Sequence, residues 1–278
     1  MKTKPHLGQT AAKVVIWTAA LSVLMVLVAI ILYILFKGIP VINWSFLTEI
    51  PRSGGRDGGI ASPIVGTLMV TALAVVIAIP FGIGTAFYLA EYTREGLITR
   101  LIRFSAESLA GIPSIIYGLF GYIFFVTYLK MGWSVLSGGL TLAIMILPTL
   151  IRTSEEAIRA VPHSYREVSF SLGGTKWQTI RKVVFPSAIR GISNGIILSI
   201  GRCVAETAAV SLTAGSMLGM PTSLSSPTRT MAMHFYILAS EGISMEKAYG
   251  TAALLIVLIF LINVVANMLI NRLASKGR

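Results

Sequence analysis

Six long stretches of this sequence are almost without charged side chains, and they constrain the fold more than any other feature. A helix needs about 20 mostly apolar residues to cross the roughly 30 Å hydrocarbon core of a membrane. The stretches are Val14–Phe36, Pro63–Ala90, Phe104–Leu129, Val135–Ile151, Gly191–Met217 and Ala248–Ile270. Charged residues make up only 12% of the 278-residue chain, about half the usual share of a soluble domain. The sequence therefore predicts an all-α integral membrane protein with six transmembrane helices and excludes a soluble globular enzyme.

The first stretch follows Lys2, Lys4 and Lys13, as the apolar core of a secretory signal peptide follows basic residues. It is longer than the usual core of about 7–15 residues, and Lys37–Pro40 offers no cleavage site made of small residues. We therefore expect a retained membrane anchor.

The distribution of lysine and arginine predicts the orientation in the membrane. If the N-terminus is cytoplasmic, the segments on that side hold 16 of the 23 basic residues, and the loops on the other side hold 6. Cytoplasmic loops carry the excess of basic residues, so we expect both termini in the cytoplasm. The same asymmetry accounts for most of the net charge of +12, so the charge needs no nucleic-acid partner. The one remaining basic residue, Arg202, falls inside the fifth stretch.

No catalytic or metal-binding pattern stands out in the sequence. The single cysteine, Cys203, and the three histidines are far apart along the chain, which argues against a metal cluster. A phosphate-binding loop of the form Gly-x-x-x-x-Gly-Lys-Ser/Thr does not occur. We therefore expect no enzyme activity, no metal and no cofactor in this chain.

The predicted cytoplasmic segment 152–190 is far longer than two helices need to turn around. Ser164–Glu167 and Thr175–Gln178 both have the spacing of a helix capping box, and Gly173–Gly174 separates them. Apolar residues follow each box at helical spacing, and Pro186 is expected to end the second helix. The segment therefore predicts two short amphipathic helices joined at the glycine pair. This pattern alone fits helices on a lipid surface as well as helices in a protein groove.

The same segment resembles the signature of ABC importer permeases, which reads Glu-Ala-Ala, three residues, Gly, nine residues, Ile-x-Leu-Pro. Glu167, Gly173 and Pro186 match it at the family spacing, whereas Val168-Ser169 and Val183–Phe185 depart from it. In that family the loop is the coupling helix, which sits in a cleft of the ATP-binding subunit. The resemblance implies the following docking residues: Glu167, Val168, Ser169, Gly173, Gly174, Trp177 and Pro186.

Other stretches resemble the phosphate-specific permeases of this family, from about residue 58 to the C-terminus. They include Tyr88–Tyr92, Ala110–Gly118 and Gly201–Thr207. The resemblance implies a type I ABC importer (MetI-like) fold with cytoplasmic coupling helices in a bacterial or archaeal plasma (inner) membrane. Residues 1–62 would form a tail, the first transmembrane helix and an extracytoplasmic loop. Residues 63–278 would form the permease core of five helices with the coupling loop.

The resemblance further implies import of inorganic phosphate by alternating access, with this chain forming half of the pathway. Its partners would be a second, PstC-like permease, two ATP-binding subunits that hold ATP and Mg, an extracytoplasmic phosphate-binding protein and membrane lipid. Import of another oxyanion, such as molybdate, tungstate or sulfate, is an alternative. An ion-coupled secondary transporter and a non-transporting scaffold are further alternatives, but a secondary transporter needs no loop that docks on an ATPase.

Arg202 stands inside the fifth stretch, where a charged residue costs about 2.5–3.5 kcal/mol on insertion scales. We expect it to face the bundle interior and to contact Glu206, one helical turn later. A purely structural ion pair is one interpretation. The other is a substrate contact, because the guanidinium fork suits tetrahedral oxyanions, and the family resemblance places Arg202 and Glu206 at the phosphate path. Thr207 and Ser211 are candidate supporting hydroxyls, although such hydroxyls often bond to their own helix.

The third stretch carries two further signals. Glu107 follows Arg103 by four residues, which predicts an ion pair within one helix. Gly111 and Pro113 predict a kink in this helix.

Overall fold

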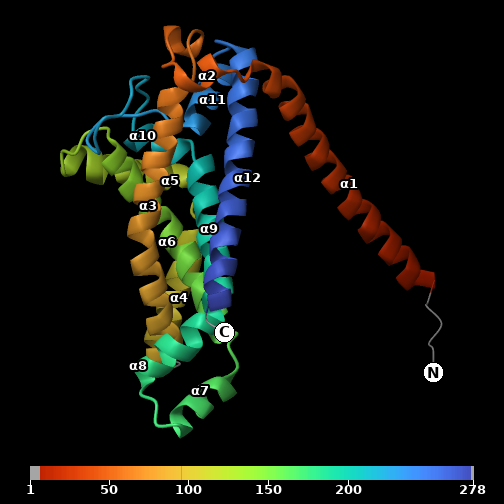
Figure 1. Ribbon diagram of the computed structural model, residues 1–278, viewed down its shortest axis with the longest axis vertical. Coiled ribbons are helices and arrows are strands. Elements are labelled where there is room, and N and C mark those ends of the chain that lie inside the picture. Colours follow the sequence, from red (N-terminus) through yellow and green to blue (C-terminus); the bar gives the residue numbers. More distant parts are fainter. Residues whose placement is uncertain (1–6, 95, 277–278) are drawn as a thin grey trace.

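The computed structural model describes residues 7–94 and 96–276. All the secondary-structure elements in this part of the chain are helices (Figure 1). Five helices are long and apolar enough to cross a membrane: Gly8–Val41, Ala61–Tyr92, Val135–Arg159, Lys176–Ala205 and Met245–Met268. A sixth span results if the bent pair Leu97–Ala110 and Ser114–Tyr128 is counted as one. On that count the predicted six stretches are all helical. Lys2, Lys4 and Arg278, which entered the predicted orientation, lie outside the described residues.

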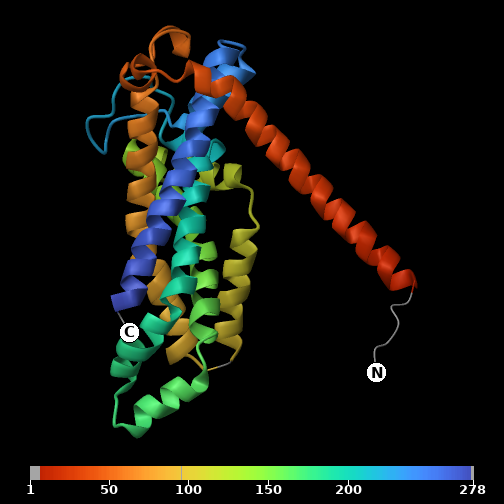
Figure 2. The ribbon, with the colours of Figure 1, turned by 45° about the vertical axis from the view of Figure 1, so that its right-hand side comes forward.

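The bundle is formed by α3 (Ala61–Phe87), α6 (Val135–Arg159), α9 (Phe185–Ala205) and α12 (Met245–Lys276), which run alongside one another (Figure 2). Helix α6 lies at its centre, because it packs against α3 and α9 and has the largest buried share of the five long helices. The most buried large side chains of α6 are Leu142, Met145, Ile146 and Leu150. The core of the bundle is thus apolar and built around the fourth predicted stretch.

Helix α1 (Leu7–Gly38) leans away from this bundle and meets it mainly through α12 (Figures 1 and 2). Its apolar side chains are exposed along its length, as expected of a helix whose surroundings are lipid or another subunit. A turn at Ile39–Val41 and the short α2 (Trp44–Thr48) lead back to the bundle. The Asn43 side chain caps α2 by accepting a hydrogen bond from the Phe46 amide at 2.8 Å.

The third predicted stretch is sharply broken. Helix α4 (Leu97–Ala110) runs along the bundle, whereas α5 (Ser114–Gly121) and the π-helical turn Tyr122–Tyr128 are turned by 98°. Pro113 has no amide proton to continue the α4 ladder, and it adopts an extended ψ of 138°. The Tyr117 hydroxyl donates to the Leu109 carbonyl at 2.8 Å and so holds the bend from within. The kink predicted from the glycine and proline is therefore confirmed, with a near-perpendicular turn.

The fifth predicted stretch begins earlier and ends earlier than expected. Helix α8 (Lys176–Thr179) continues through a π-helical turn, Ile180–Val184, directly into α9. The prediction that Pro186 ends the helix is wrong, because Pro186 occupies the first turn of α9. Proline is accommodated there because it follows directly on the π-helical turn, where the regular α-helical hydrogen-bond ladder is already interrupted. Beyond Ala205 the helix is interrupted, and the short α10 (Ala208–Thr213) follows.

The two ends of the bundle carry different elements (Figure 1). One end, here called the α7 end, carries α7 (His163–Ser171) and α8, and the described ends of α1 and α12 point the same way. The opposite end carries α2, the loop after it and α11 (Met231–Ser240). The segments rich in basic residues therefore share one end, which agrees with the predicted distribution of charge.

A buried histidine stands at the end opposite to α7. His234 is fully buried in α11, and its Nδ1 lies 3.5 Å from Nη1 of Arg229. Arg229 donates to the carbonyl and hydroxyl of Ser216 and to the Gly54 carbonyl, which ties the loop after α2 to the segment before α11. Burial, with the positive charges of Arg229 and Lys247, lowers the pKa of His234 to about 4. This end is therefore held together by the hydrogen bonds of Arg229, beside a histidine that burial keeps neutral.

Candidate functional site

Arg202 lies in the last turn of α9 and is partly buried against α6. Its Nη1 donates to the Thr149 hydroxyl oxygen at 3.4 Å, and within the described chain its side chain forms no other hydrogen bond. No carboxylate of the described residues forms an ion pair with Arg202. The guanidinium therefore keeps most of its five donors available, in a place where a buried charge is normally paired.

Glu206 does not pair with Arg202 as the four-residue spacing predicts. The helix ends at Ala205, and Glu206 adopts an extended backbone with φ of −72° and ψ of 130°. Its carboxylate accepts a hydrogen bond from the Ala209 amide at 3.1 Å, at the start of α10. The prediction is wrong because residues four apart are neighbours only in an unbroken helix.

The two candidate hydroxyls are placed differently from the prediction of one shared helix. Thr207 stands at the break, just before α10, and its side chain makes no capping hydrogen bond there. The Ser211 hydroxyl donates to the Ala208 carbonyl at 2.8 Å, so it is satisfied within α10. Ser211 lines a groove with Tyr122 and Trp133 rather than contacting Arg202.

Two broken helices meet near Arg202. Gly118 of α5 packs against α10 so closely that a Cβ atom on it would lie 2.8 Å from the Cα of Ala209. Tyr117, beside it on α5, lies within the electrostatic reach of Arg202. The helices that follow the two breaks, α5 and α10, therefore pack against each other. Irregular backbone inside a membrane bundle is tolerated where it is buried in protein or lines a water-filled cavity.

Thr149 is a site residue that sequence reasoning missed. It follows Pro148 in α6 and reaches Arg202 from a different helix. The only signal in the sequence is a hydroxyl within an apolar stretch. Such hydroxyls usually bond to their own helix, so this signal does not reveal a partner 53 residues away.

The loop between α6 and α9 contains the two short helices that the sequence predicts. The second capping box is confirmed, because the Gln178 amide donates to the Thr175 hydroxyl and the Thr175 amide donates to the Gln178 side chain. The first box is not formed. Helix α7 begins at His163 directly after Pro162, so Ser164 lies inside the helix and makes no cap.

The glycine pair joins these helices, as predicted. Gly173 adopts a φ of +77° in open surroundings, a conformation that favours glycine. The Gly174 amide donates to the Ser169 carbonyl at 3.0 Å. The Ser169 hydroxyl also contacts the Thr179 hydroxyl at 2.8 Å, which ties α7 to α8.

Both of these helices expose large apolar side chains. These side chains are between 49% and 83% exposed: Tyr165, Val168, Phe170, Leu172 and Trp177. We call these five residues the loop surface. Glu167 beside it is exposed, and its carboxylate has no ion pair within the described chain. Tyr165, Val168 and Leu172 line one groove, and exposed apolar side chains grouped in this way mark an interaction surface. Trp177 lines a separate groove beside α3. Pro186 is exposed at the start of α9.

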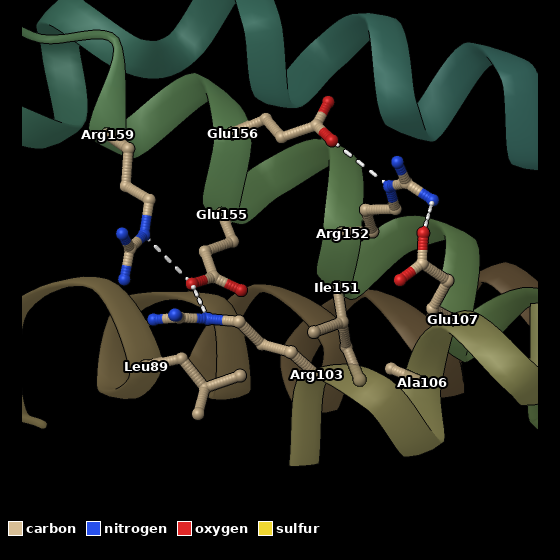
Figure 3. A pocket seen from close by; sticks show the side chains of 9 residues that line it. All are labelled: Leu89, Arg103, Ala106, Glu107, Ile151, Arg152, Glu155, Glu156 and Arg159. Carbon is tan, nitrogen blue, oxygen red and sulfur yellow. Dashed lines mark hydrogen bonds and ion pairs between the residues drawn. The ribbon is translucent and has the colours of Figure 1, made fainter. Parts of the chain in front are cut away.

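Ion pairs tie α4 to α6 near the loop, as Figure 3 shows. Glu155 accepts from Arg103 of α4 at 2.7 Å and from Arg159 at 2.9 Å. Arg152 donates to Glu107 at 2.9 Å and to Glu156 at 3.0 Å. The predicted pair of Glu107 with Arg103 is therefore wrong. Both residues turn instead to partners on α6, because the packing of α4 against α6 offers them closer opposite charges.

Comparison with known sequences gives a consistent result. The family described as "Binding-protein-dependent transport system inner membrane component" matches residues 78–277. The "Probable ABC transporter permease protein YqgI" of Bacillus subtilis is 30% identical and covers 90% of this chain and 91% of its own length. The "Phosphate transport system permease protein PstA" of Pasteurella multocida is 32% identical over 86% of both chains. PstA 1 of Mycobacterium tuberculosis is 34% identical over 80% of this chain and 73% of its own.

Solved structures share the fold at low sequence identity. A chain of a bacterial alginate ABC transporter, in complex with an alginate-bound periplasmic protein, matches with a TM-score of 0.65 and 16% identity. That match covers 96% of this chain and 98% of the other. A chain of the inward-facing MetNI methionine ABC transporter matches with a TM-score of 0.64 and 17% identity, over 77% of this chain and 95% of the other. The transmembrane fold predicted from the sequence, MetI-like and all-helical, is confirmed by these matches.

Proposed function

Because this chain belongs to the family of binding-protein-dependent transport system inner membrane components, we propose that it imports inorganic phosphate as the permease subunit of an ATP-driven transporter. The chain is a multi-pass inner membrane protein, and ATP hydrolysis takes place in a separate subunit of such importers. The substrate, the partners and the roles of single residues are the proposal.

The observation that carries this proposal is the guanidinium of Arg202, which contacts a threonine hydroxyl and no carboxylate of the described chain. Withdrawing even part of a charge from water without a partner costs free energy, and Arg202 is half-buried. A passing oxyanion supplies that partner for a short time, through hydrogen bonds to a charged group worth about 1.5–3 kcal/mol. An arginine already saturated by a carboxylate would have to break that pair first.

Several oxyanions fit an arginine fork, so the choice of phosphate rests on the relatives. Chains named as phosphate transport permeases are 32% and 34% identical over most of their length. Molybdate, tungstate and sulfate remain the alternatives of the same class. An ion-coupled secondary transporter is disfavoured, because the family imports with a binding protein.

In the proposed mechanism this chain forms half of the path, and a second, PstC-like permease forms the other half. Two ATP-binding subunits dock on the loop surface and on Glu167 at the cytoplasmic side, where both termini lie. ATP binding moves α7 and α8 and opens the path to the phosphate-binding protein. Phosphate then passes Arg202, while Glu206 holds the start of α10 and Thr207 lies at the break. Ser211 remains a candidate further along the path.

The experiment that tests the substrate uses the complete complex in proteoliposomes. It contains both permeases, the two ATP-binding subunits and the binding protein. We expect ATP-dependent uptake of radiolabelled phosphate that equal concentrations of molybdate or sulfate do not suppress. Preferred uptake of either competitor would contradict phosphate as the substrate.

A second experiment tests docking of the loop surface. Leu172, which is 83% exposed in the loop surface, is changed to serine. The control is Leu97→Ser, because Leu97 is also 83% exposed and begins α4, outside the loop. We expect the ATP-binding subunits to co-purify less with Leu172→Ser alone. Equal co-purification for both variants would contradict docking at this surface.

A further inference from the structure

Arg166 lies next to Glu167 in α7, but its environment is the opposite of the exposed loop surface. Its side chain is 11% exposed and pairs with Glu91, whose side chain is 9% exposed. Nε and Nη2 of Arg166 donate to the same carboxylate oxygen of Glu91 at 3.0 Å and 2.6 Å. The family signature covers Glu167 and does not include Arg166, so the resemblance gives this residue no role.

The same guanidinium also holds the end of α6. Arg166 donates to the carbonyls of Ile158 at 3.1 Å, Val161 at 2.8 Å and Pro162 at 3.4 Å. These carbonyls belong to the last turn of α6 and to the connection that leads into α7. Arg166 therefore fixes α7 to the corner after α6, and Glu91 fixes that corner to a different span.

Glu91 belongs to the π-helical turn Tyr88–Tyr92. This turn directly continues α3 and forms the last turn of the span Ala61–Tyr92. The second loop helix reaches the same turn, because Nζ of Lys176 in α8 lies 4.8 Å from the centre of the Tyr92 ring. Both loop helices therefore contact one short turn. π-helical turns frequently occur at functional sites.

We propose that Arg166 and Glu91 are the positioning pair that transmits a displacement of α7 to α3. The Arg166 guanidinium donates to three carbonyls and to a buried carboxylate, so its position is fixed. Breaking any of these hydrogen bonds would leave a buried polar group unsatisfied. Apart from this link, α7 packs mainly on α8 and on the turn that follows it. Movement of α7 thus carries the end of α3 with it. This inference rests on the proposed docking of α7, but not on the identity of the substrate.

Replacement of Glu91 by alanine separates the two functions of Arg166. The three carbonyl bonds remain and keep α7 on α6, whereas the connection to α3 is lost. In the reconstituted complex we expect phosphate moved per ATP hydrolysed to fall about tenfold, within the usual range of allosteric coupling. ATP hydrolysis itself stays near the wild-type rate. Glu91→Gln keeps an acceptor without the charge, and we expect an intermediate loss.

The matched control is Glu156→Ala. Glu156 also pairs with an arginine at the α7 end, but its side chain is 64% exposed and the pair lies within α6. We expect this variant to keep both transport and ATP hydrolysis. A parallel fall of both activities in Glu91→Ala would mean a merely structural pair and would overturn the proposal, as would unchanged coupling.

A second measurement does not depend on the substrate. Spin labels at Ser164 in α7 and Phe81 in α3, both at exposed positions, report the distance between these helices. We expect this distance to stay constant through the ATP cycle in the otherwise unchanged complex and to vary with ATP in Glu91→Ala. A distance that varies equally in both would overturn the link. The two proposals can fail separately. If Leu172→Ser loses the ATP-binding subunits, docking at the loop surface stands. If the distance also stays constant in Glu91→Ala, the link between α7 and α3 is overturned.

Discussion

Arg166 and Arg202 are both at least partly withdrawn from solvent, and their surroundings are opposite. Arg166 at the α7 end is paired with Glu91 and bonded to three backbone carbonyls. Arg202 at the break after α9 contacts only the Thr149 hydroxyl within the described chain.

The difference separates a charge that holds the protein together from a charge that is open to a ligand. A saturated guanidinium resists displacement, because removing any partner leaves buried polar groups unpaired. A guanidinium with most donors unused binds an anion without first losing a protein contact. The chain thus offers a rigid connection at one place and an anion contact at another.

The largest expected effect on stability follows from Arg166→Ala. This change leaves the carboxylate of Glu91 buried without its partner, which typically costs about 3–5 kcal/mol. We expect a clearly lower melting temperature for the purified permease complex, whereas Arg202→Ala shifts it little. Equal shifts for the two variants would remove the distinction between the two arginines.

His234 is a buried basic side chain that the fold keeps neutral. Its pKa of about 4 lies below the ordinary value of 6.5. Above about pH 6.5 the histidine is neutral in both the folded and the unfolded state, and the free energy of unfolding is at its full value. As the pH falls from 6.5 toward 4, the unfolded state binds a proton that the folded state does not. The free energy of unfolding then decreases by at most about 3 kcal/mol. Melting temperatures measured between pH 7 and pH 4 check this.

The control for this titration is an exposed histidine. His234→Gln is expected to flatten the dependence of the melting temperature on pH, because the buried titrating group is gone. His163→Gln, at an exposed position at the start of α7, is expected to keep the wild-type slope. An unchanged slope in His234→Gln would show that other groups dominate.

The smallest effect is expected for the exposed pair of Arg152 and Glu156, whose side chains are 53% and 64% exposed. Solvent screens such pairs and the long side chains lose freedom on pairing, so their net contribution is small. Arg152→Gln is expected to leave the melting temperature near that of the wild type. A drop as large as that of Arg166→Ala would show that burial does not decide the importance of an ion pair here.

The sequence predicts those features that depend on local length and pattern. Six apolar stretches become helices, because the helix is the form that satisfies its own backbone within a single segment in lipid. The capping box at Thr175 forms as its pattern predicts, whereas the equally local box at Ser164 does not, because α7 begins at His163 directly after Pro162. The bend at Gly111 and Pro113 follows from the missing amide of proline.

The features that the sequence does not predict depend on distant residues. Two ion pairs were inferred from four-residue spacing, for Arg202 with Glu206 and for Arg103 with Glu107, and both are wrong. The first fails because the helix stops between the partners. The second fails because α6 offers nearer carboxylates and guanidinium groups. The partner of Arg166 lies 75 residues away in the chain, and no local pattern identifies it.

The most direct test of the account measures ATP-dependent phosphate uptake by the reconstituted complex with Arg202→Gln. The glutamine removes the charge but keeps a polar side chain of similar reach. We expect uptake to fall at least about tenfold, the equivalent of losing one hydrogen-bonded charge, with ATP hydrolysis and melting temperature near wild type. Wild-type uptake at an unchanged KM for phosphate would contradict the account.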